Sequence, residues 1–97
     1  MKTGNSSEEN IVRKHIFFFG RVQGVGFRYC SMDKAKSIGL TGWVKNLYDG
    51  SVEMEVQGTE SDIEILIQYL NNQRYIHIDR MEIQSMELKN ERSFMLH

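Results

Sequence analysis

The glycine-rich stretch GRVQGVGFR, residues 20–28, combines residue types that bind anions. Its three glycines let the backbone adopt positive φ angles, so that successive amide groups can converge on one phosphate-sized anion. The segment that follows has helical spacing, and the unpaired amides of a helix N-terminus attract anions further. Arg28 carries a planar fork of donors that matches phosphate oxygens. The stretch therefore predicts a phosphate site, although a tight turn with solvated arginines fits the loop alone equally well.

Two segments together resemble the acylphosphatase family. They are GRVQGVGFR with Ser31 and Ala35 behind it, and GLTGWVKN from Gly39 to Asn46 with DGSVE from Asp49 to Glu53 and Gly58. The resemblance is specific because both motifs must occur with the family's order and spacing. It implies an enzyme that hydrolyses the carboxyl-phosphate anhydride of small acyl phosphates to carboxylate and phosphate. After Gly58 only the helix and a strand at Asp79 to Ile83 extend the resemblance.

The resemblance also implies roles for individual residues. Arg28 and the backbone amides of the loop would hold the phosphate, and Asn46 would orient the attacking water through its amide. The loop residues expected to bind phosphate are Arg21, Val22, Gln23, Gly24, Val25 and Gly26. The side chain of Arg21 is expected to be a solvated or orienting charge. Asn46 has a second interpretation, since asparagine bonds readily to nearby backbone and could simply open a hairpin loop.

The chemistry of an acyl phosphate suits these donors. The departing carboxylate is stable as an anion, so the reaction requires no general acid. It requires charge stabilisation on the phosphoryl oxygens and a water held in line with the leaving group. Neither motif places a carboxylate or a histidine at its key position. The three histidines have no partner at a metal-ligand spacing, so we predict neither a metal site nor a cofactor.

Composition and charge limit the other functions. The 97 residues support one small domain, and 40% hydrophobic with 26% charged residues is typical of a globular protein. A net charge of -1 provides no basic field for nucleic acid or an anionic membrane. A binder of single-stranded RNA would carry its aromatic residues on a basic surface. This chain lacks that positive charge around its candidate aromatic residues, which are Phe17, Phe19 and Tyr48. A noncatalytic anion-sensing domain remains the alternative, because a phosphate cradle binds with or without an activated water.

Residue composition and patterning also indicate the domain organisation and location of the protein. Residues 1–10 are polar and unpatterned, so we expect a flexible tail before a single domain at 11–97. No apolar run approaches the roughly 20 residues of a membrane span, and no signal-peptide core is present. Cys30 is the single cysteine, which agrees with a reducing compartment, and we expect it to be a buried packing thiol. We expect a cytoplasmic monomer that acts on a small molecule.

The elements that must position the site follow from periodicity. Ile11 to Phe19 is predicted to be a strand, with Ile16 and Phe18 on one face. Phe17 and Phe19 would share the other face, and the sequence leaves open what covers Phe17. A helix is predicted from Phe27 to Ile38. The segments Thr41 to Tyr48 and Ser51 to Gln57 are predicted to form an antiparallel hairpin that turns at Asp49-Gly50, with Glu53 and Glu55 on a solvated face.

The second half predicts a helix and two strands. Ser61 is predicted to cap a helix, with Glu64 three residues on and an apolar stripe of Ile63, Leu66, Ile67 and Leu70. Strands are predicted at Tyr75 to Leu88 and Ser93 to Leu96. The order strand, helix, strand, strand, helix, strand predicts an α+β ferredoxin-like sandwich, with two helices on one face of an antiparallel sheet. The family resemblance implies the same fold.

Overall fold

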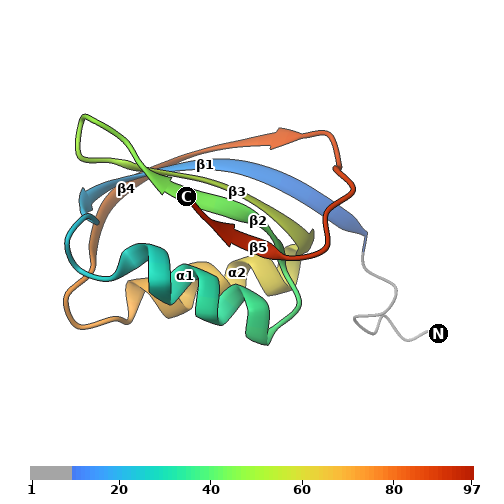
Figure 1. The fold of residues 1–97 in the computed structure, drawn as a ribbon, viewed down its shortest axis with the longest axis horizontal. Coiled ribbons are helices and arrows are strands. Elements are labelled where there is room, and N and C mark those ends of the chain that lie inside the picture. The colour runs from blue at the N-terminus through green and yellow to red at the C-terminus, as the bar shows by residue number, and fades with distance from the viewer. Residues whose placement is uncertain (1–9) are drawn as a thin grey trace.

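The computed structural model describes residues 10–97, which form a five-stranded sheet with two helices on one face (Figure 1). The elements are β1 (Ile11–Arg21), α1 (Phe27–Ser37), β2 (Thr41–Asn46), β3 (Val52–Thr59), α2 (Glu60–Asn71), β4 (His77–Met86) and β5 (Phe94–Leu96). The predicted ferredoxin-like α+β sandwich is confirmed. The expected flexible tail lies outside the described residues except for Asn10.

The sheet is mixed rather than purely antiparallel. Its strand order is β4-β1-β3-β2-β5, and β1 pairs with β3 and β4 while β2 pairs with β3, all antiparallel. The short β5 runs parallel to β2, so the prediction of an antiparallel sheet is wrong at this edge. The reason is that β4 and β5 lie at opposite edges. The chain between them crosses the sheet, and no tight hairpin turn sets the direction of β5.

The alternation along β1 separates a helix-covered face from an open one, as predicted. Ile16 and Phe18 are fully buried under the helices, together with the α2 stripe predicted to be core. On the other face the rings of His15 and Phe17 lie 4.8 Å apart, and the Arg80 guanidinium lies 3.9 Å from the centroid of the Phe19 ring. Neighbouring polar side chains therefore cover the two phenylalanines that no helix reaches.

The β2-β3 hairpin turns where the sequence predicts. Gly50 has a φ of 92°, a conformation that favours glycine, and the amide of Leu47 donates to the Ser51 carbonyl at 2.9 Å. The Asp49 carboxylate accepts from the Ser51 amide at 2.9 Å, which closes the turn. Hydrogen bonds from Ser51 lower the pKa of Asp49. These hydrogen bonds define the turn that follows the end of β2.

The start of α2 differs from the prediction. The hydroxyl of Thr59 accepts from the amide of Asp62 at 3.1 Å, so Thr59 is the cap and the helix begins at Glu60. The predicted cap at Ser61 is wrong, because that residue already lies in the first helical turn. Thr59 has extended backbone angles and ends β3, so strand and helix meet without a loop. The first residue of a helix is harder to locate from sequence when the helix follows a strand without a loop between them.

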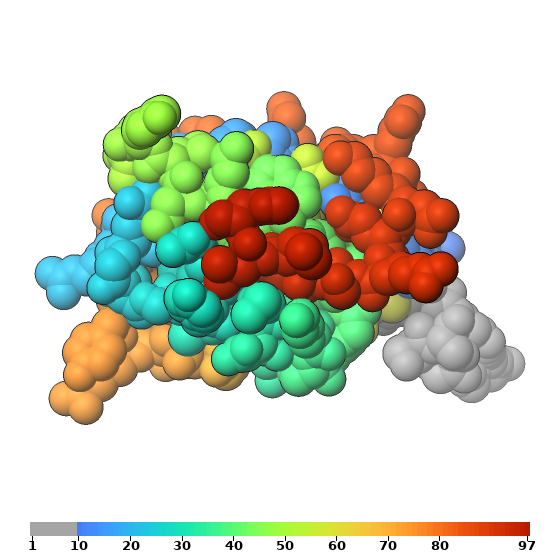
Figure 2. Space-filling view, in the orientation of Figure 1, coloured from blue at the N-terminus to red at the C-terminus, as the bar shows by residue number. Residues whose placement is uncertain are grey.

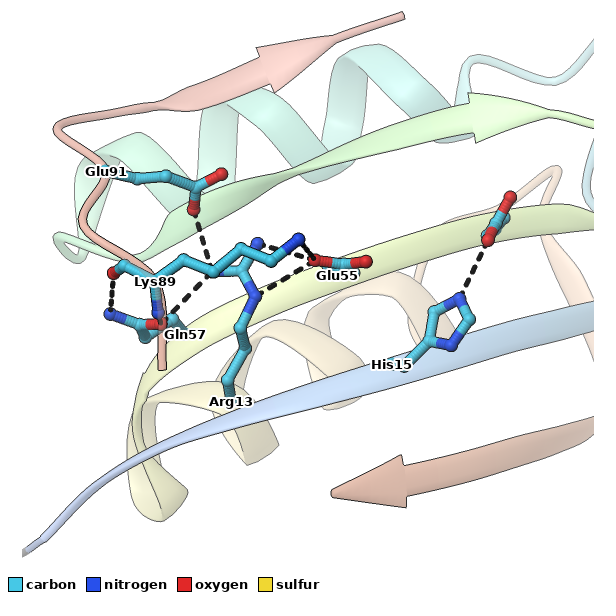
Figure 3. A network of polar contacts seen from close by, with 7 residues as sticks. Arg13, His15, Glu55, Gln57, Lys89 and Glu91 are labelled. Carbon is cyan, nitrogen blue, oxygen red and sulfur yellow. Dashed lines mark hydrogen bonds and ion pairs between the residues drawn. The ribbon is translucent and has the colours of Figure 1, made fainter. Parts of the chain in front are cut away.

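The environment of the Glu55 side chain also differs from the prediction. It lies on the face without helices, yet its side chain is only 10% exposed. The Nε and Nη2 atoms of Arg13 donate to its Oε1 at 3.0 and 2.8 Å, and Lys89 Nζ donates to the same oxygen at 3.0 Å (Figure 3). The expected solvated position is wrong because the chain between β4 and β5 crosses this part of the sheet and excludes water.

The two buried charges have shifted pKa values. Burial raises the pKa of Glu55, but hydrogen bonds from Arg13 and Lys89 outweigh it and leave that pKa below its ordinary value of 4.5. Burial lowers the pKa of Arg13, and the bonds to Glu91 and Glu55 outweigh it in the opposite direction. Both groups are therefore charged at neutral pH, and the pair is buried in its ionised form.

We expect the Glu55 carboxylate to make stability depend on acid pH. Because its folded pKa lies below the unfolded one, its contribution is complete above the ordinary value and is lost as pH falls through the folded pKa. At about pH 7, Glu55→Gln should lower the free energy of unfolding by about 3 kcal/mol, since it leaves Arg13 buried with one charged partner fewer. Urea denaturation at about pH 7 and about pH 3 measures this. A difference from wild type that stays the same at both values would contradict the prediction.

Candidate active site

The glycine-rich loop, the start of α1 and the end of β2 surround one hollow of about 190 Å³. It is lined by Val22, Gly24, Gly26, Phe27, Arg28, Tyr29 and Asn46. Figure 1 shows why these segments meet, since the β1-α1 loop and the tip of the β2-β3 hairpin lie at the same end of the molecule. The fold thus brings Arg28 and Asn46, the two residues predicted to be catalytic, to a single hollow.

The backbone of the loop has the conformation that the glycines predicted. Gly24 and Gly26 have φ angles of 73° and 81°, in the left-handed region that other residues rarely adopt. Gly26 directly precedes α1 and leaves the helix without a side-chain cap, and the first turn contains no acidic residue. The first amides of a helix have no partner within it. This helix start can therefore donate to an anion and attract it through the helix dipole.

Arg28 is held by His97, the residue that follows β5. Its Nη1 donates to the carbonyl oxygen of His97 at 2.7 Å. His97 is in turn fixed on β2, because its amide donates to the Val44 carbonyl at 2.9 Å and its ring meets the edge of Trp43. In Figure 2 the C-terminal residues lie directly against α1. The bond occupies one nitrogen of the guanidinium and leaves the others for a ligand.

Asn46 is the last residue of β2, and its Cα pairs with that of Val52. Its side chain is exposed and borders the hollow. Among residues 10–97 no other side chain or carbonyl bonds to its amide group, while the hairpin turn is closed by Leu47, Asp49 and Ser51. The interpretation of Asn46 as a mere opener of the hairpin loop therefore has no support in this turn.

The side chain of Gln23 makes a contact next to the hollow that sequence reasoning missed. Its Nε2 donates to the carbonyl oxygens of Leu47 and Ser51, at 2.7 and 2.8 Å. These bonds connect the glycine-rich loop to the β2-β3 hairpin and hence fix the loop relative to Asn46. The sequence predicted only a backbone contribution from Gln23. A side chain that bonds to two distant carbonyls leaves no local pattern by which it could have been found.

The other predicted loop residues are placed differently from one another. Val22 borders the hollow with a buried side chain, so that only its backbone can face a ligand. Val25 packs against the core. Arg21 ends β1, where it pairs with His77, and its exposed side chain lines a separate hollow of about 400 Å³ with Arg74. The structure therefore does not bring the Arg21 side chain to the hollow of Arg28.

The remaining candidates for chemistry do not form a cluster. Within residues 10–97, no group of three or more His, Cys, Asp or Glu side chains is arranged to hold a metal ion. Cys30 is partly buried against the core, and burial raises the pKa of its thiol, so it stays protonated at neutral pH. None of the helices in the described part of the chain is long and apolar enough to cross a membrane.

Known proteins share this chain's sequence and fold. The acylphosphatase family model matches residues 14–96. An acylphosphatase of Bifidobacterium longum is 41% identical over 83 residues, which are 84% of this chain and 86% of the relative. The crystal structure of acylphosphatase from Bacillus subtilis matches with a TM-score of 0.82 at 31% identity, over 89% of this chain and 98% of that one.

A second solved structure gives the same result. An acylphosphatase from Coxiella burnetii matches with a TM-score of 0.82 at 29% identity, and the match covers 98% of this chain and 100% of that one. The family match spans both motifs on which the resemblance depended, and it extends beyond Gly58, where the sequence motifs became sparse. The chain belongs to the acylphosphatase family, a family of hydrolases that act on acid anhydrides.

Proposed function

We propose that this chain hydrolyses the carboxyl-phosphate anhydride of small acyl phosphates to carboxylate and inorganic phosphate. The observation that carries the proposal is the meeting of Arg28, the uncapped start of α1 and Asn46 at one hollow of about 190 Å³. Membership in the acylphosphatase family supports the reaction class. A noncatalytic anion sensor would need the cradle alone, whereas this hollow also offers an amide side chain with no partner among the described residues. We further propose a cytoplasmic monomer.

In this scheme the phosphoryl group is held by donors only. The guanidinium of Arg28 and the amides between Gly24 and the first turn of α1 donate to its oxygens. These donors are in place before the reaction, so they stabilise the charge of the transition state without reorganising. The bond from Arg28 to the carbonyl of His97 keeps the guanidinium oriented toward the hollow.

Asn46 supplies the second requirement, a positioned water. Its carboxamide oxygen accepts a hydrogen bond from the water and directs a lone pair of the water at phosphorus. The water oxygen bonds to phosphorus as the bond from phosphorus to the acyl oxygen breaks, and the carboxylate leaves with that electron pair. Both hydrogens of the water end on the phosphate product, so neither a general acid nor a metal ion enters the scheme.

Hydrolysis of benzoyl phosphate tests the proposal. Carboxylate and phosphate release should be measured in excess chelator for the wild type and for variants of Arg28 and Asn46. Rapid release by the wild type that both variants lose would support the assignment. Phosphate binding without hydrolysis would favour the anion sensor over the enzyme. Loss of activity in chelator would show that the reaction requires a metal ion, which the scheme does not include.

We expect Gln23→Leu to reduce turnover while leaving a folded protein. The substitution preserves the size of the side chain but removes two hydrogen bonds, so the loop is no longer tied to the hairpin that carries Asn46. We expect kcat to fall about tenfold, because small misplacement of reacting groups is costly, and stability to fall by about 1–2 kcal/mol. Steady-state kinetics and urea denaturation measure the two effects. The exposed Gln68→Leu on α2 is the control, and equal kinetics for the two variants would disprove the positioning role.

A further inference from the structure

The chain between β4 and β5 crosses one end of the sheet. Because the two strands lie at opposite edges, residues 87–93, here called the crossing segment, must pass over β1, β3 and β2. Figure 1 shows this passage at the end where β1 begins, while the β1-α1 loop lies at the other end. β5 then runs from the crossing segment toward the active site. The position of its last residue therefore depends on how the crossing segment is held.

Arg13 of β1 holds the crossing segment through a hydrogen bond to Glu91. Its side chain is completely buried although it lies on the face without helices, and all three of its side-chain nitrogens have an acceptor. Nε and Nη2 bind Glu55, and Nη1 donates to Glu91 of the crossing segment at 2.8 Å (Figure 3). Nη1 also donates to Gln57 at 3.1 Å. A buried guanidinium with this complete set of partners has a single orientation.

Gln57 and Lys89 provide a second point of attachment. The Oε1 of Gln57 accepts from the Lys89 amide, and its Nε2 donates to the Lys89 carbonyl, both at 2.9 Å. The Lys89 ammonium reaches Glu55 at 3.0 Å. The crossing segment is thus attached at residues 89 and 91 to side chains of β1 and β3. This arrangement orders a segment that has no regular secondary structure of its own.

β5 connects this segment to the site. The Ser93 carbonyl accepts from the Gly42 amide at 3.2 Å, Phe94 is fully buried, and the His97 carbonyl accepts from Arg28. The strand has only three residues in its ladder with β2, so few hydrogen bonds hold it. A short edge strand frays readily unless the chain before it is ordered. Fraying here would remove the acceptor that orients the Arg28 guanidinium.

We infer that Arg13, at the far end of the sheet, is a positioning residue for Arg28 and acts through the crossing segment and the carbonyl of His97. The inference rests on the proposed function of Arg28 as the phosphate-binding cation. Glu55 and Gln57 share this role because they orient Arg13 and the crossing segment. The seven residues from Glu91 to His97 connect the two ends of this path, and they contain the whole of β5.

Enzyme kinetics with benzoyl phosphate test the inference on the full chain. Arg13→Met should lower kcat/KM about three- to tenfold and weaken inhibition by inorganic phosphate, at a temperature where the variant is folded. Glu91→Gln keeps the buried pair of Arg13 and Glu55, so it should fold well and show a smaller change of the same kind. Hydrogen exchange of residues 94–97 should become faster in both variants. Wild-type kinetics in both variants would overturn the inference.

A control and a truncated chain separate positioning from general loss of stability. Ile63→Val removes one methyl group from the core under α2, on the face of the sheet opposite to Arg13 and Glu55, and should leave kcat/KM and phosphate inhibition unchanged. In a chain that ends at Leu96, Arg13→Met should cause no further loss of kcat/KM. Losses that multiply in that background would overturn the path through His97. If Arg28→Ala itself retained full activity, the proposed function of Arg28 would fail instead, whatever Arg13 does.

Discussion

Replacing Arg28 with alanine should lower kcat/KM by roughly a thousandfold or more. Among the described residues that line the hollow, the guanidinium is the one cationic side chain, and the substitution removes both its charge and its fork of donors. The phosphoryl group bears negative charge in the substrate and in the transition state, so the loss should raise KM and inhibition by phosphate should weaken. Steady-state hydrolysis of benzoyl phosphate with phosphate as inhibitor measures both effects.

Two further variants make this result specific. Arg28→Lys keeps a positive charge without the planar fork, and we expect it to recover binding more than turnover, because the ammonium lacks the coplanar pair of N–H groups that binds two phosphoryl oxygens side by side. Arg74→Ala removes another exposed arginine, from the separate hollow next to β4, and should match the wild type. If Arg28→Ala retained a rate close to that of Arg74→Ala, the guanidinium of Arg28 would have no part in the mechanism.

Most of the fold could be predicted because its elements carry local signals. The alternation of Ile16 and Phe18, the apolar stripe of α2 and the Asp49-Gly50 turn each depend on neighbours in the chain. Two of the wrong predictions share a different cause. The direction of β5 and the burial of Glu55 both depend on where the crossing segment lies, which is a contact between residues far apart in sequence. No periodicity encodes such a contact.

In the candidate site, too, the features set by local residue type could be predicted, and the contacts between distant residues could not. The positive φ angles of Gly24 and Gly26 follow from residue type, and the structure shows the expected loop before α1. That Arg28 and Asn46 share a hollow came from the family resemblance, and the hairpin geometry provides its physical basis. Gln23 was assigned to the loop for its backbone, but the contact of its side chain with the hairpin was not predicted, and His97 was not assigned to the site. In each case a side chain donates to a backbone carbonyl of another segment, Gln23 to Leu47 and Ser51 and Arg28 to His97, and backbone acceptors are identical at every residue of a sequence.

Asn46→Ala should separate binding from chemistry. The substitution removes the group that we propose to hold the water, while Arg28 and the start of α1 remain in place to bind phosphate. We therefore expect kcat to fall about a hundred- to a thousandfold, with little change in KM or in inhibition by phosphate. This pattern differs from that of Arg28→Ala, in which binding and turnover should fall together. Benzoyl phosphate kinetics on the two variants under the same conditions measure the difference.

The isosteric Asn46→Asp variant tests the reason for an amide at this position. A carboxylate still accepts a hydrogen bond from water, but it places a negative charge beside the phosphoryl oxygens and lacks the N–H donor. We expect its kcat to stay as low as that of Asn46→Ala and its KM to rise. Asn71→Ala, at the exposed end of α2, controls for the loss of an asparagine. An active Asn46→Ala would mean that water reaches phosphorus without this side chain, and the cradle around Arg28 alone would then account for catalysis.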